Sequence, residues 1–218
     1  MTTSANIEAP SPSSLRLVLT LAIAGLISGI AIIGIYESTL PTITANKARE
    51  LREAVFKVLP GVSQMQALAY RDGQLVAIDE QRKDEEVVYG GYDQQGGFLG
   101  YAVPAAGPGF QDTIGILYGY EPEQNLVIGM EVLESRETPG LGDKIYKDAE
   151  FVGGFSALSI EPEIVAVKKG TKSQPNEIDA ITGATISSKA VVRIINETHV
   201  QWSERLPPPG SEPPLEGP

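Results

Sequence analysis

A threonine hydroxyl at the start of a helix is the group in this sequence best placed to do chemistry. Residues 179–196 read Asp-Ala-Ile-Thr-Gly-Ala-Thr-Ile-Ser-Ser-Lys-Ala-Val-Val-Arg-Ile-Ile-Asn. The first half is a turn built on Gly183, and the second half has the apolar spacing of a helix. Thr185 therefore lies at a helix entrance, where free backbone N–H groups and the positive end of the helix dipole favour an anion such as phosphate. A hydroxyl in that place could itself carry a phosphate as an ester.

An ordinary helix cap is the alternative role for Thr185. The side-chain oxygen of an N-cap threonine accepts a backbone N–H, which stabilises the helix by about 1 kcal/mol. The tetrapeptide at residues 182–185 does not by itself distinguish a cap from an ester site, because short motifs match by chance. Both interpretations stay open on these residues alone.

A second glycine-rich segment precedes the first one in the chain. Residues 134–145 read Glu-Ser-Arg-Glu-Thr-Pro-Gly-Leu-Gly-Asp-Lys-Ile. Pro139 followed by Gly140 suits a tight turn, and small residues let the backbone approach a flat ligand closely. A turn that binds no ligand is the alternative interpretation of this loop.

Together the two segments resemble the FMN-binding domain family. Asp179, the run Thr-Gly-Ala-Thr at 182–185 and the serine pair at 187–188 resemble the family's flavinylation motif, and residues 137–142 resemble its second signature. Within this family the chain is most similar to the G subunit of Rnf electron-transport complexes, with the C subunit of the sodium-translocating NADH:quinone reductase as a relative. The resemblance extends to about Glu204. Two signatures in the expected order are much harder to produce by chance than one.

The resemblance implies FMN joined through its phosphate to Thr185. Thr182, Gly183 and Ala184 then belong to the attachment motif, which a flavin transferase using FAD and magnesium recognises. Asp179 becomes a candidate for guiding the transfer, while its alternative role is that of a turn-closing side chain.

The loop at residues 137–142 would lie near the isoalloxazine ring under the same resemblance. Its candidate ring contacts are Glu137, Thr138, Gly140 and Leu141. Tyr146 could be either a core residue or a neighbour of the ring. The flavin, held by its ribityl tail, would carry electrons between membrane subunits of an ion-translocating ferredoxin:NAD oxidoreductase complex.

The composition excludes several other kinds of site. The chain of 218 residues has no cysteine and one histidine, His199, which rules out cysteine-ligated iron–sulfur clusters, thiolate zinc sites and bis-histidine sites. A net charge of −11 argues against nucleic-acid binding, which needs clustered Lys and Arg. We expect no metal ligands and no catalytic side chain, so redox chemistry must come from an organic cofactor.

An apolar anchor begins the series of elements that position these loops. We expect residues 1–14 to be a disordered tail and residues 15–36 a transmembrane helix, because residues 17–36 carry no charge and span a bilayer core as a helix. A cleaved signal peptide is the alternative. Counting basic residues would place the domain in the cytoplasm. The resemblance instead implies a bacterial inner-membrane protein with its domain on the periplasmic side.

A juxtamembrane segment over residues 37–60 is expected to form a second helix, which Pro41 opens in an N1-like position. It would be a stalk between anchor and domain. A helix lying on the lipid surface is less favoured, because acidic residues are mixed into its polar face.

The fold class predicted for the FMN-binding domain, residues 61–205, is α+β, with an antiparallel sheet and packed helices. Short β-rich runs between turn signals predict strands over residues 67–70, 75–78, 87–92, 98–103, 113–118 and 126–133. Helices are predicted over residues 144–153 and from Thr185 to near Arg205, and one more strand over residues 164–168. The Pro-rich tail, residues 206–218, is predicted to be disordered.

Two other functions remain open on the sequence. The chain could be a membrane-anchored flavoprotein of another electron chain. It could also be a non-redox binding module tethered to the membrane, in which Thr185 only caps its helix. The electron-transfer subunit agrees best with the two signatures.

Overall fold

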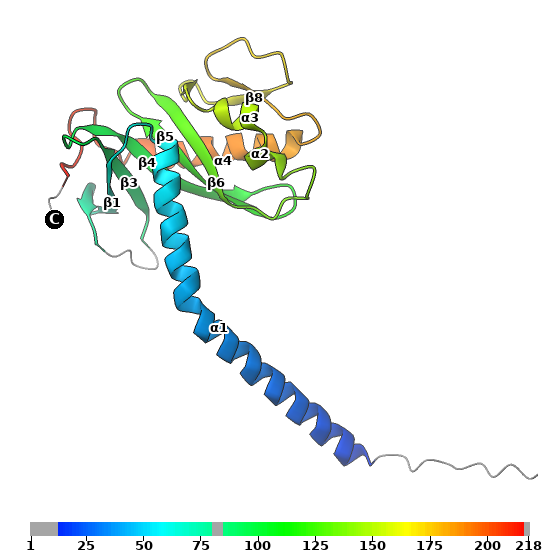
Figure 1. The fold of residues 1–218 in the computed structure, drawn as a ribbon. Coiled ribbons are helices and arrows are strands. Elements are labelled where there is room, and N and C mark those ends of the chain that lie inside the picture. Colours follow the sequence, from blue (N-terminus) through cyan, green and yellow to red (C-terminus); the bar gives the residue numbers. More distant parts are fainter. Residues whose placement is uncertain (1–12, 80–84, 216–218) are drawn as a thin grey trace, which may run out of the picture. The chain divides into compact units, whose positions relative to one another are not determined.

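The computed structural model describes residues 13–79 and 85–215, and its contacts divide the chain into two units, Met1–Arg49 and Glu50–Pro218. Helix α1 (Ser14–Val58) begins in the first unit and ends in the second (Figure 1). Among the described residues it is the one helix with the length and composition of a membrane span. Its most apolar window has a mean hydropathy of 2.5, and none of that window is buried.

Helix α1 is continuous where the sequence predicts two helices. Pro41, the predicted start of a second helix, lies inside α1. Proline removes one backbone hydrogen bond, but its fixed φ is helical, so the bonds of the neighbouring turns carry the helix across it. The predicted start at Pro41 is therefore wrong, although both predicted segments are helical.

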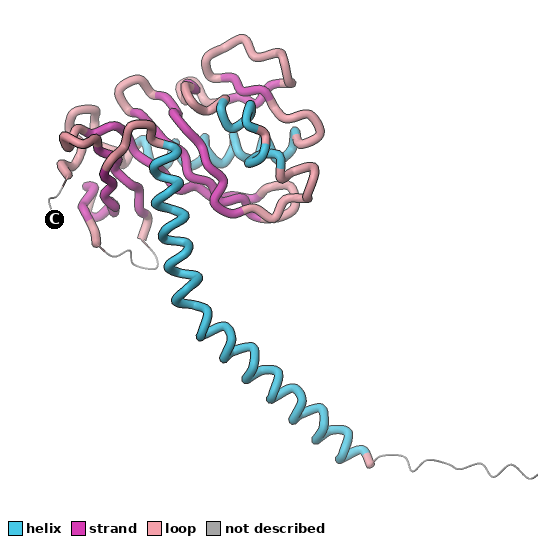
Figure 2. Tube along the Cα trace, viewed as in Figure 1, coloured by secondary structure: helices cyan, strands magenta, loops and turns pink. Residues whose placement is uncertain are grey.

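A seven-stranded antiparallel sheet forms the centre of the second unit (Figure 2). Its strand order is β2-β1-β3-β4-β5-β6-β7. The strands are β1 (Gln64–Arg71), β2 (Gln74–Ala77), β3 (Val87–Tyr92), β4 (Phe98–Pro108), β5 (Thr113–Glu121), β6 (Leu126–Glu134) and β7 (Leu158–Ser159). A separate parallel pair joins β8 (Val165–Val167) and β9 (Glu177–Asp179). The predicted α+β class is confirmed.

Strand β4 continues through two prolines beyond its predicted end at residue 103. Strand β3 pairs with residues 98–102 of β4, so among the described strands β5 alone pairs with β4 from Pro104 to Pro108. Proline cannot donate to a sheet ladder, but on a strand with one free side the missing N–H can face that side. The half-free position of β4 explains why the proline-containing segment remains a strand.

The two faces of the sheet bury different apolar clusters. On one face lie α4 (Thr185–Ser203) and the short helices α2 (Lys144–Lys147) and α3 (Ala149–Gly153). The last turn of α1 covers the other face, with Val55 and Val58 fully buried, as is Leu59 directly after the helix. Neighbouring strand residues alternate between the clusters, as do Tyr101 and Ala102, because side chains along a strand point to opposite faces.

The end of α1 lies against glycines of the sheet. A Cβ atom added to Gly119 would lie 2.0 Å from the Val58 carbonyl oxygen, and one added to Gly129 would lie 2.6 Å from it. These two glycines are directly paired across β5 and β6. A side chain at either position would displace the helix end, so the glycines set how closely α1 approaches the sheet.

Helix α4 buries the face that its sequence predicts. Val191, Ile194, Ile195 and Trp202 are all buried, and the helix ends at Ser203, close to the predicted Arg205. His199 is buried on the same helix, 4.8 Å between ring centroids from Tyr120.

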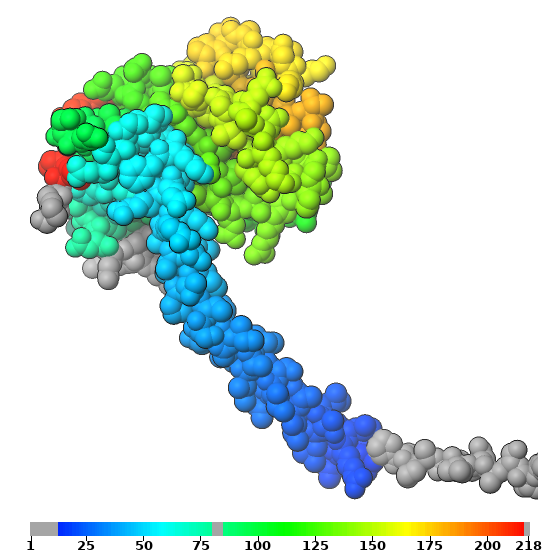
Figure 3. All heavy atoms as spheres, in the orientation of Figure 1, coloured from blue at the N-terminus to red at the C-terminus, as the bar shows by residue number. Residues whose placement is uncertain are grey.

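The C-terminal segment, residues 206–215, contacts the domain. The Tyr92 hydroxyl donates a hydrogen bond to the Pro213 carbonyl at 2.7 Å, and Leu206 packs on the core. Figure 3 shows the red C-terminal residues against the green part of the sheet. The disorder predicted from the proline content is thus not seen in this segment, because proline carbonyls still accept hydrogen bonds and proline loses little chain entropy on ordering. Residues 1–12 and 216–218, in the tails predicted to be disordered, lie outside the described residues.

Candidate functional site

A cleft of about 320 Å³ opens where the two glycine-rich loops meet the start of α4. Its walls come from the loop after β4, the loop after β6 and the first turn of α4. The lining residues are Phe110, Thr138, Leu141, Gly142, Gly183, Ala184, Thr185, Ile186 and Ser187. The fold therefore brings five candidate site residues of the sequence into one cleft: Thr138, Leu141, Gly183, Ala184 and Thr185.

Thr185 is the first residue of α4 and does not act as its cap. The N-cap position belongs to Ala184, which has no side chain able to cap. The Thr185 hydroxyl donates a long hydrogen bond, 3.5 Å, to the Ile181 carbonyl oxygen. Thr185 is exposed to solvent. The capping role that the sequence leaves open is therefore not formed, and the hydroxyl is accessible at the helix entrance.

The first turn of α4 has backbone donors without acceptors. In the described part of the chain, no acceptor bonds the N–H groups of Thr185, Ile186 or Ser187, whereas the Ser188 N–H bonds the Ala184 carbonyl at 2.9 Å. Free donors at a helix start combine with the helix dipole to give a positive potential. The entrance of α4 thus suits an anionic group.

The turn that leads into α4 is held from inside the helix. The Ser188 hydroxyl accepts the Ile181 N–H at 3.1 Å and donates to the Ala184 carbonyl at 3.0 Å. Gly183 has φ of +83°, a left-handed conformation that favours glycine. These features fix the backbone on both sides of Thr182, which is exposed but does not line the cleft.

Glu137, a candidate ring contact on the sequence, is a buried link between three segments. Its Oε1 accepts the N–H groups of Phe110 at 2.8 Å and Gln111 at 2.9 Å. Its Oε2 accepts the Ser187 hydroxyl at 2.5 Å. Glu137 is only 5% exposed and does not line the cleft. The carboxylate therefore joins the β4–β5 loop and α4 to its own loop.

The carboxylate of Glu137 is kept ionised by its donors. Burial by itself would raise the pKa of Glu137, but the hydrogen bonds from Ser187 and from backbone N–H groups outweigh burial, and the pKa is lowered. A Cβ atom on Gly109 or on Gly142 would lie 2.5 Å from a carboxylate oxygen. The two glycines make room for this buried charge.

The remaining residues of the second loop shape the cleft wall. Gly140 has φ of +79°, and the Leu141 N–H bonds the Thr138 carbonyl at 3.1 Å, which forms the predicted turn. Thr138 also donates its hydroxyl to Gln111 at 2.8 Å. Gly140 does not line the cleft. Tyr146 is 45% exposed and belongs to neither core cluster.

The rim of the cleft is apolar and exposed. Phe110 is 63% exposed, Leu141 52% and Ile186 60%. Sequence reasoning missed Phe110 and Ile186 as lining residues, although Phe110 follows a Pro-Gly turn signal and Ile186 follows the threonine itself. Apolar walls beside a few convergent polar groups are typical of cofactor sites. The residues present fit a planar ring carrying a phosphate.

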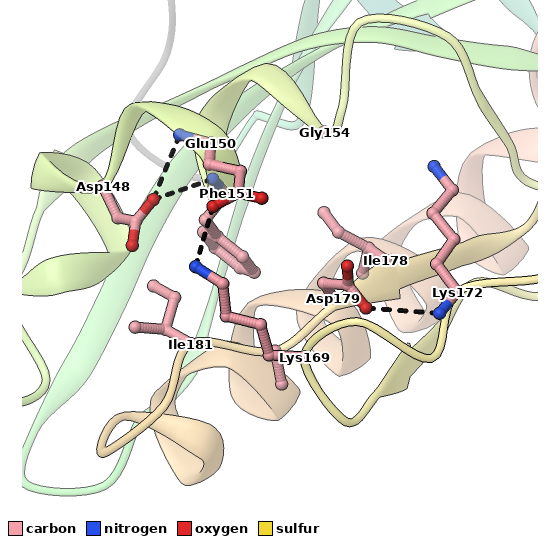
Figure 4. A pocket seen from close by; sticks show the side chains of 10 residues that line it. Asp148, Glu150, Phe151, Gly154, Lys169, Lys172, Ile178, Asp179 and Ile181 are labelled. Atoms are coloured by element: carbon pink, nitrogen blue, oxygen red, sulfur yellow. Dashed lines mark hydrogen bonds and ion pairs between the residues drawn. The ribbon is translucent and has the colours of Figure 1, made fainter.

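Asp179 lies in a second cleft, of about 200 Å³ (Figure 4). Its Oδ1 accepts the backbone N–H groups of Gly170 at 3.0 Å and Lys172 at 3.3 Å. In the same cleft, Lys169 forms an ion pair with Glu150 at 2.7 Å. Asp179 thus makes the hydrogen bonds of a turn-closing side chain, one of the two roles that the sequence leaves open.

Comparison with known proteins shows the family and the fold of this chain. Residues 109–199, which contain both loops and most of α4, match the FMN-binding domain family. Two solved structures share the fold. Shewanella oneidensis NqrC has a TM-score of 0.58 at 20% identity and covers 70% of this chain and 91% of its own. The C subunit of the Na⁺-translocating NADH-quinone reductase from Parabacteroides distasonis has a TM-score of 0.59 at 17% identity and covers 74% and 94%.

Curated relatives align with a larger share of the chain than the FMN-binding match. The G subunit of the Na⁺-translocating ferredoxin:NAD⁺ oxidoreductase complex of Acetobacterium woodii is 36% identical over 148 residues, 64% of this chain and 68% of the relative. The G subunit of the proton-translocating ferredoxin:NAD⁺ oxidoreductase complex of Clostridium ljungdahlii is 30% identical over 177 residues, 81% and 85%. The G subunit of the ion-translocating oxidoreductase complex of Methanosarcina acetivorans is 27% identical, covering 81% and 88%. The chain therefore belongs to the G-subunit family of ion-translocating oxidoreductase complexes.

Proposed function

We propose that this chain is the FMN-carrying electron-transfer subunit of an ion-translocating ferredoxin:NAD oxidoreductase complex of the Rnf type, with FMN joined through its phosphate to Thr185. Membership of the G-subunit family and the FMN-binding match support the role. One observation carries the attachment site. Thr185 is exposed at the entrance of α4, its hydroxyl is not used as a cap, and the residue lines the cleft beside unpaired backbone donors.

Attachment requires a flavin transferase that uses FAD and magnesium. The Thr185 Oγ forms a bond to the phosphorus on the FMN side of FAD, and the bond from that phosphorus to the bridging oxygen breaks. AMP leaves with that oxygen, and the hydroxyl proton passes to a base of the transferase. The exposure of Thr185 gives such an enzyme access to the hydroxyl.

The chain's own residues would bind and orient the cofactor. Phe110, Leu141 and Ile186 would supply an apolar wall for the ring, and the N–H groups of the first turn of α4 would bind the phosphate. Glu137 connects the β4–β5 loop to α4 through its hydrogen bonds with Phe110 and Ser187. When bound, FMN accepts and releases electrons one or two at a time. Attachment through the phosphate leaves the ring free for exchange while preventing loss of the cofactor, which suits a carrier.

We place the apolar part of α1 in a bacterial inner membrane, with the domain on the periplasmic side, where it would contact other membrane subunits of the complex. The length and hydropathy of α1 support a membrane span. Protease added to intact spheroplasts should digest the domain and leave the anchor. A domain that is cut only after lysis would contradict this orientation.

The attachment is tested by the intact mass of the full chain co-produced with a flavin transferase. The native chain and Thr185→Ser should gain one FMN less one water, about 438 Da, with fluorescence that survives denaturation. Thr185→Ala should gain nothing. Thr138→Ala is the matched control, because its hydroxyl lines the same cleft from the other loop, and it should gain the full mass. A native chain left unmodified by an active transferase, or a loaded Thr185→Ala chain, would overturn the proposal.

A further inference from the structure

The ammonium group of Lys144 lies beside the loop that leads to Thr185. A methyl group added to Gly183 would be 3.8 Å from the Lys144 Nζ, and Gly183 lines the cleft just before Thr185. Lys144 begins α2 shortly after Gly142, which lines the wall formed by the second loop. The fold therefore brings a cation from one glycine-rich segment to the backbone of the other.

Lys144 has no ion pair with any described residue, unlike its neighbour Lys147. The Lys147 Nζ lies 2.5 Å from the Asp143 carboxylate, a bond that lowers the pKa of Asp143 and raises the pKa of Lys147. The acidic side chain next to Lys144 is thus already hydrogen-bonded to another lysine. Lys144 itself is half-buried. Lys144 contributes to the attraction that lowers the pKa of Asp143, but it makes no ion pair, so this partly desolvated cation still favours an anionic ligand.

We propose that Lys144 is the counterion of the cofactor phosphate at Thr185 and makes the cleft select a phosphorylated flavin. This inference rests on the function proposed above. A phosphodiester between a flavin and a threonine carries one negative charge, and a charge-assisted bond to phosphate is stronger than a neutral one. Thr185 supplies the covalent bond, the first turn of α4 supplies backbone donors, and Lys144 supplies the compensating charge.

Non-covalent binding separates this role from a structural one. The full chain carrying Thr185→Ala, in detergent, is titrated with FMN and with riboflavin, which lacks the phosphate, by flavin fluorescence. Adding Lys144→Met should raise the Kd for FMN about tenfold, the scale of one charged hydrogen bond, and leave the Kd for riboflavin unchanged. Lys189→Met, which removes an exposed lysine of α4 that lines neither cleft, should change neither.

Two results of this titration would overturn the proposal. An equal loss for FMN and riboflavin would mean that Lys144 shapes the cleft wall, and no loss for either would mean that it makes no contact. Binding of FMN by the Lys144→Met chain should also depend less on salt concentration than binding by its parent, because one ionic contact is missing.

The rate of attachment gives a second measurement on the chain with native Thr185. Lys144→Met should slow the gain of FMN mass about tenfold, and Lys144→Arg should restore it, because arginine also pairs with phosphate. The ³¹P resonance of the loaded Lys144→Met chain should be shifted from that of the native chain. If the native chain is loaded and the Met variant matches it in rate and in ³¹P shift, the role of Lys144 fails while the proposed function stands. A native chain that is never loaded would remove both.

Discussion

The segment from Asp179 to Thr185 borders two clefts whose polar groups differ in one respect. In the cleft that contains Asp179, Lys169 pairs with Glu150 and Asp179 accepts two backbone N–H groups, so these charged side chains have partners within the chain. In the cleft that contains Thr185, the N–H groups of Thr185, Ile186 and Ser187 have no acceptor among the described residues, and the apolar rim is exposed.

The difference assigns separate roles to the two ends of one motif. Polar groups that are hydrogen-bonded within the chain, as the Asp179 carboxylate is, ordinarily belong to the scaffold. A cleft that leaves donors open at a helix entrance is prepared for a ligand. Under the proposed function, Asp179 would maintain the shape of the segment, and Thr185 would be the residue that carries the cofactor.

The largest effect is expected where the open cleft is held together. Glu137→Ala removes the acceptor of three hydrogen bonds and leaves backbone N–H groups of the β4–β5 loop without a partner. Losing several bonds to a buried charged group should lower the free energy of unfolding by about 2–4 kcal/mol and reduce attachment of FMN. Thermal melting followed by circular dichroism, with intact mass on the same samples, measures both.

Glu137→Gln is the matched control for that change. Its amide oxygen can accept both backbone N–H groups, and its NH₂ can donate to the Ser187 oxygen, so it should lose about 1 kcal/mol. Equal losses for the Ala and Gln variants would show that the charge, and not the hydrogen-bond pattern, holds the loops. No loss for either would remove Glu137 from the organisation of the cleft.

The next largest effect is expected at Asp179, and it tests whether Asp179 and Thr185 have the separate roles proposed for them. Asp179→Ala removes the acceptor that closes the loop at residues 168–172 and should slow FMN attachment about tenfold. Asp179→Asn keeps an oxygen that accepts the same N–H groups and should stay within about threefold of the native rate. Mass spectrometry over a time course with the transferase measures the rates. An Asn variant as slow as the Ala variant would mean that the transferase reads the charge of Asp179 directly.

Local patterns account for what could be predicted here from the sequence. The helix after Thr185 follows from its apolar spacing, and its buried residues are those expected. The β-rich runs became strands because each combines β-forming residues with turn signals at its ends. The Gly183 turn and the Pro139-Gly140 turn follow from residue type, since glycine tolerates positive φ.

Long-range contacts account for what could not be predicted. Glu137 binds partners 27 and 50 positions away, and a carboxylate in a loop is ordinarily exposed, so its burial leaves no local signal. Gly119 and Gly129 likewise could not be predicted, because the Val58 carbonyl oxygen that leaves no room for a side chain there belongs to α1, which is distant in the sequence. Asp179, which the sequence places in the motif, makes its hydrogen bonds with a loop that no periodicity predicts.

The smallest effect is expected at His199, whose ring is buried in the core. In the described part of the chain neither ring nitrogen of His199 has a hydrogen-bond partner, as with the donors at Thr185, but His199 is buried against Tyr120. Burial lowers the pKa of His199, although the nearby Glu161 acts in the opposite direction. The unpaired N–H groups at the start of α4 should therefore affect cofactor binding, whereas the buried ring nitrogens of His199 should affect only the pH dependence of stability.

The test for His199 is the pH dependence of stability. Its pKa in the folded chain lies below the unfolded value of about 6.5, so at pH values below about 6.5 the unfolded chain binds a proton that the folded chain binds less readily. The stability that comes from keeping His199 neutral is thus complete above about pH 6.5 and is lost as the pH falls toward the lower pKa. Melting temperatures measured from pH 8 to pH 5 should drop less for His199→Phe than for the native chain, while FMN attachment at neutral pH stays unchanged. If the melting temperatures of the two chains fall equally with pH, protonation of His199 does not destabilise the folded chain. If His199→Phe loses FMN attachment, the buried histidine and the Thr185 cleft are coupled.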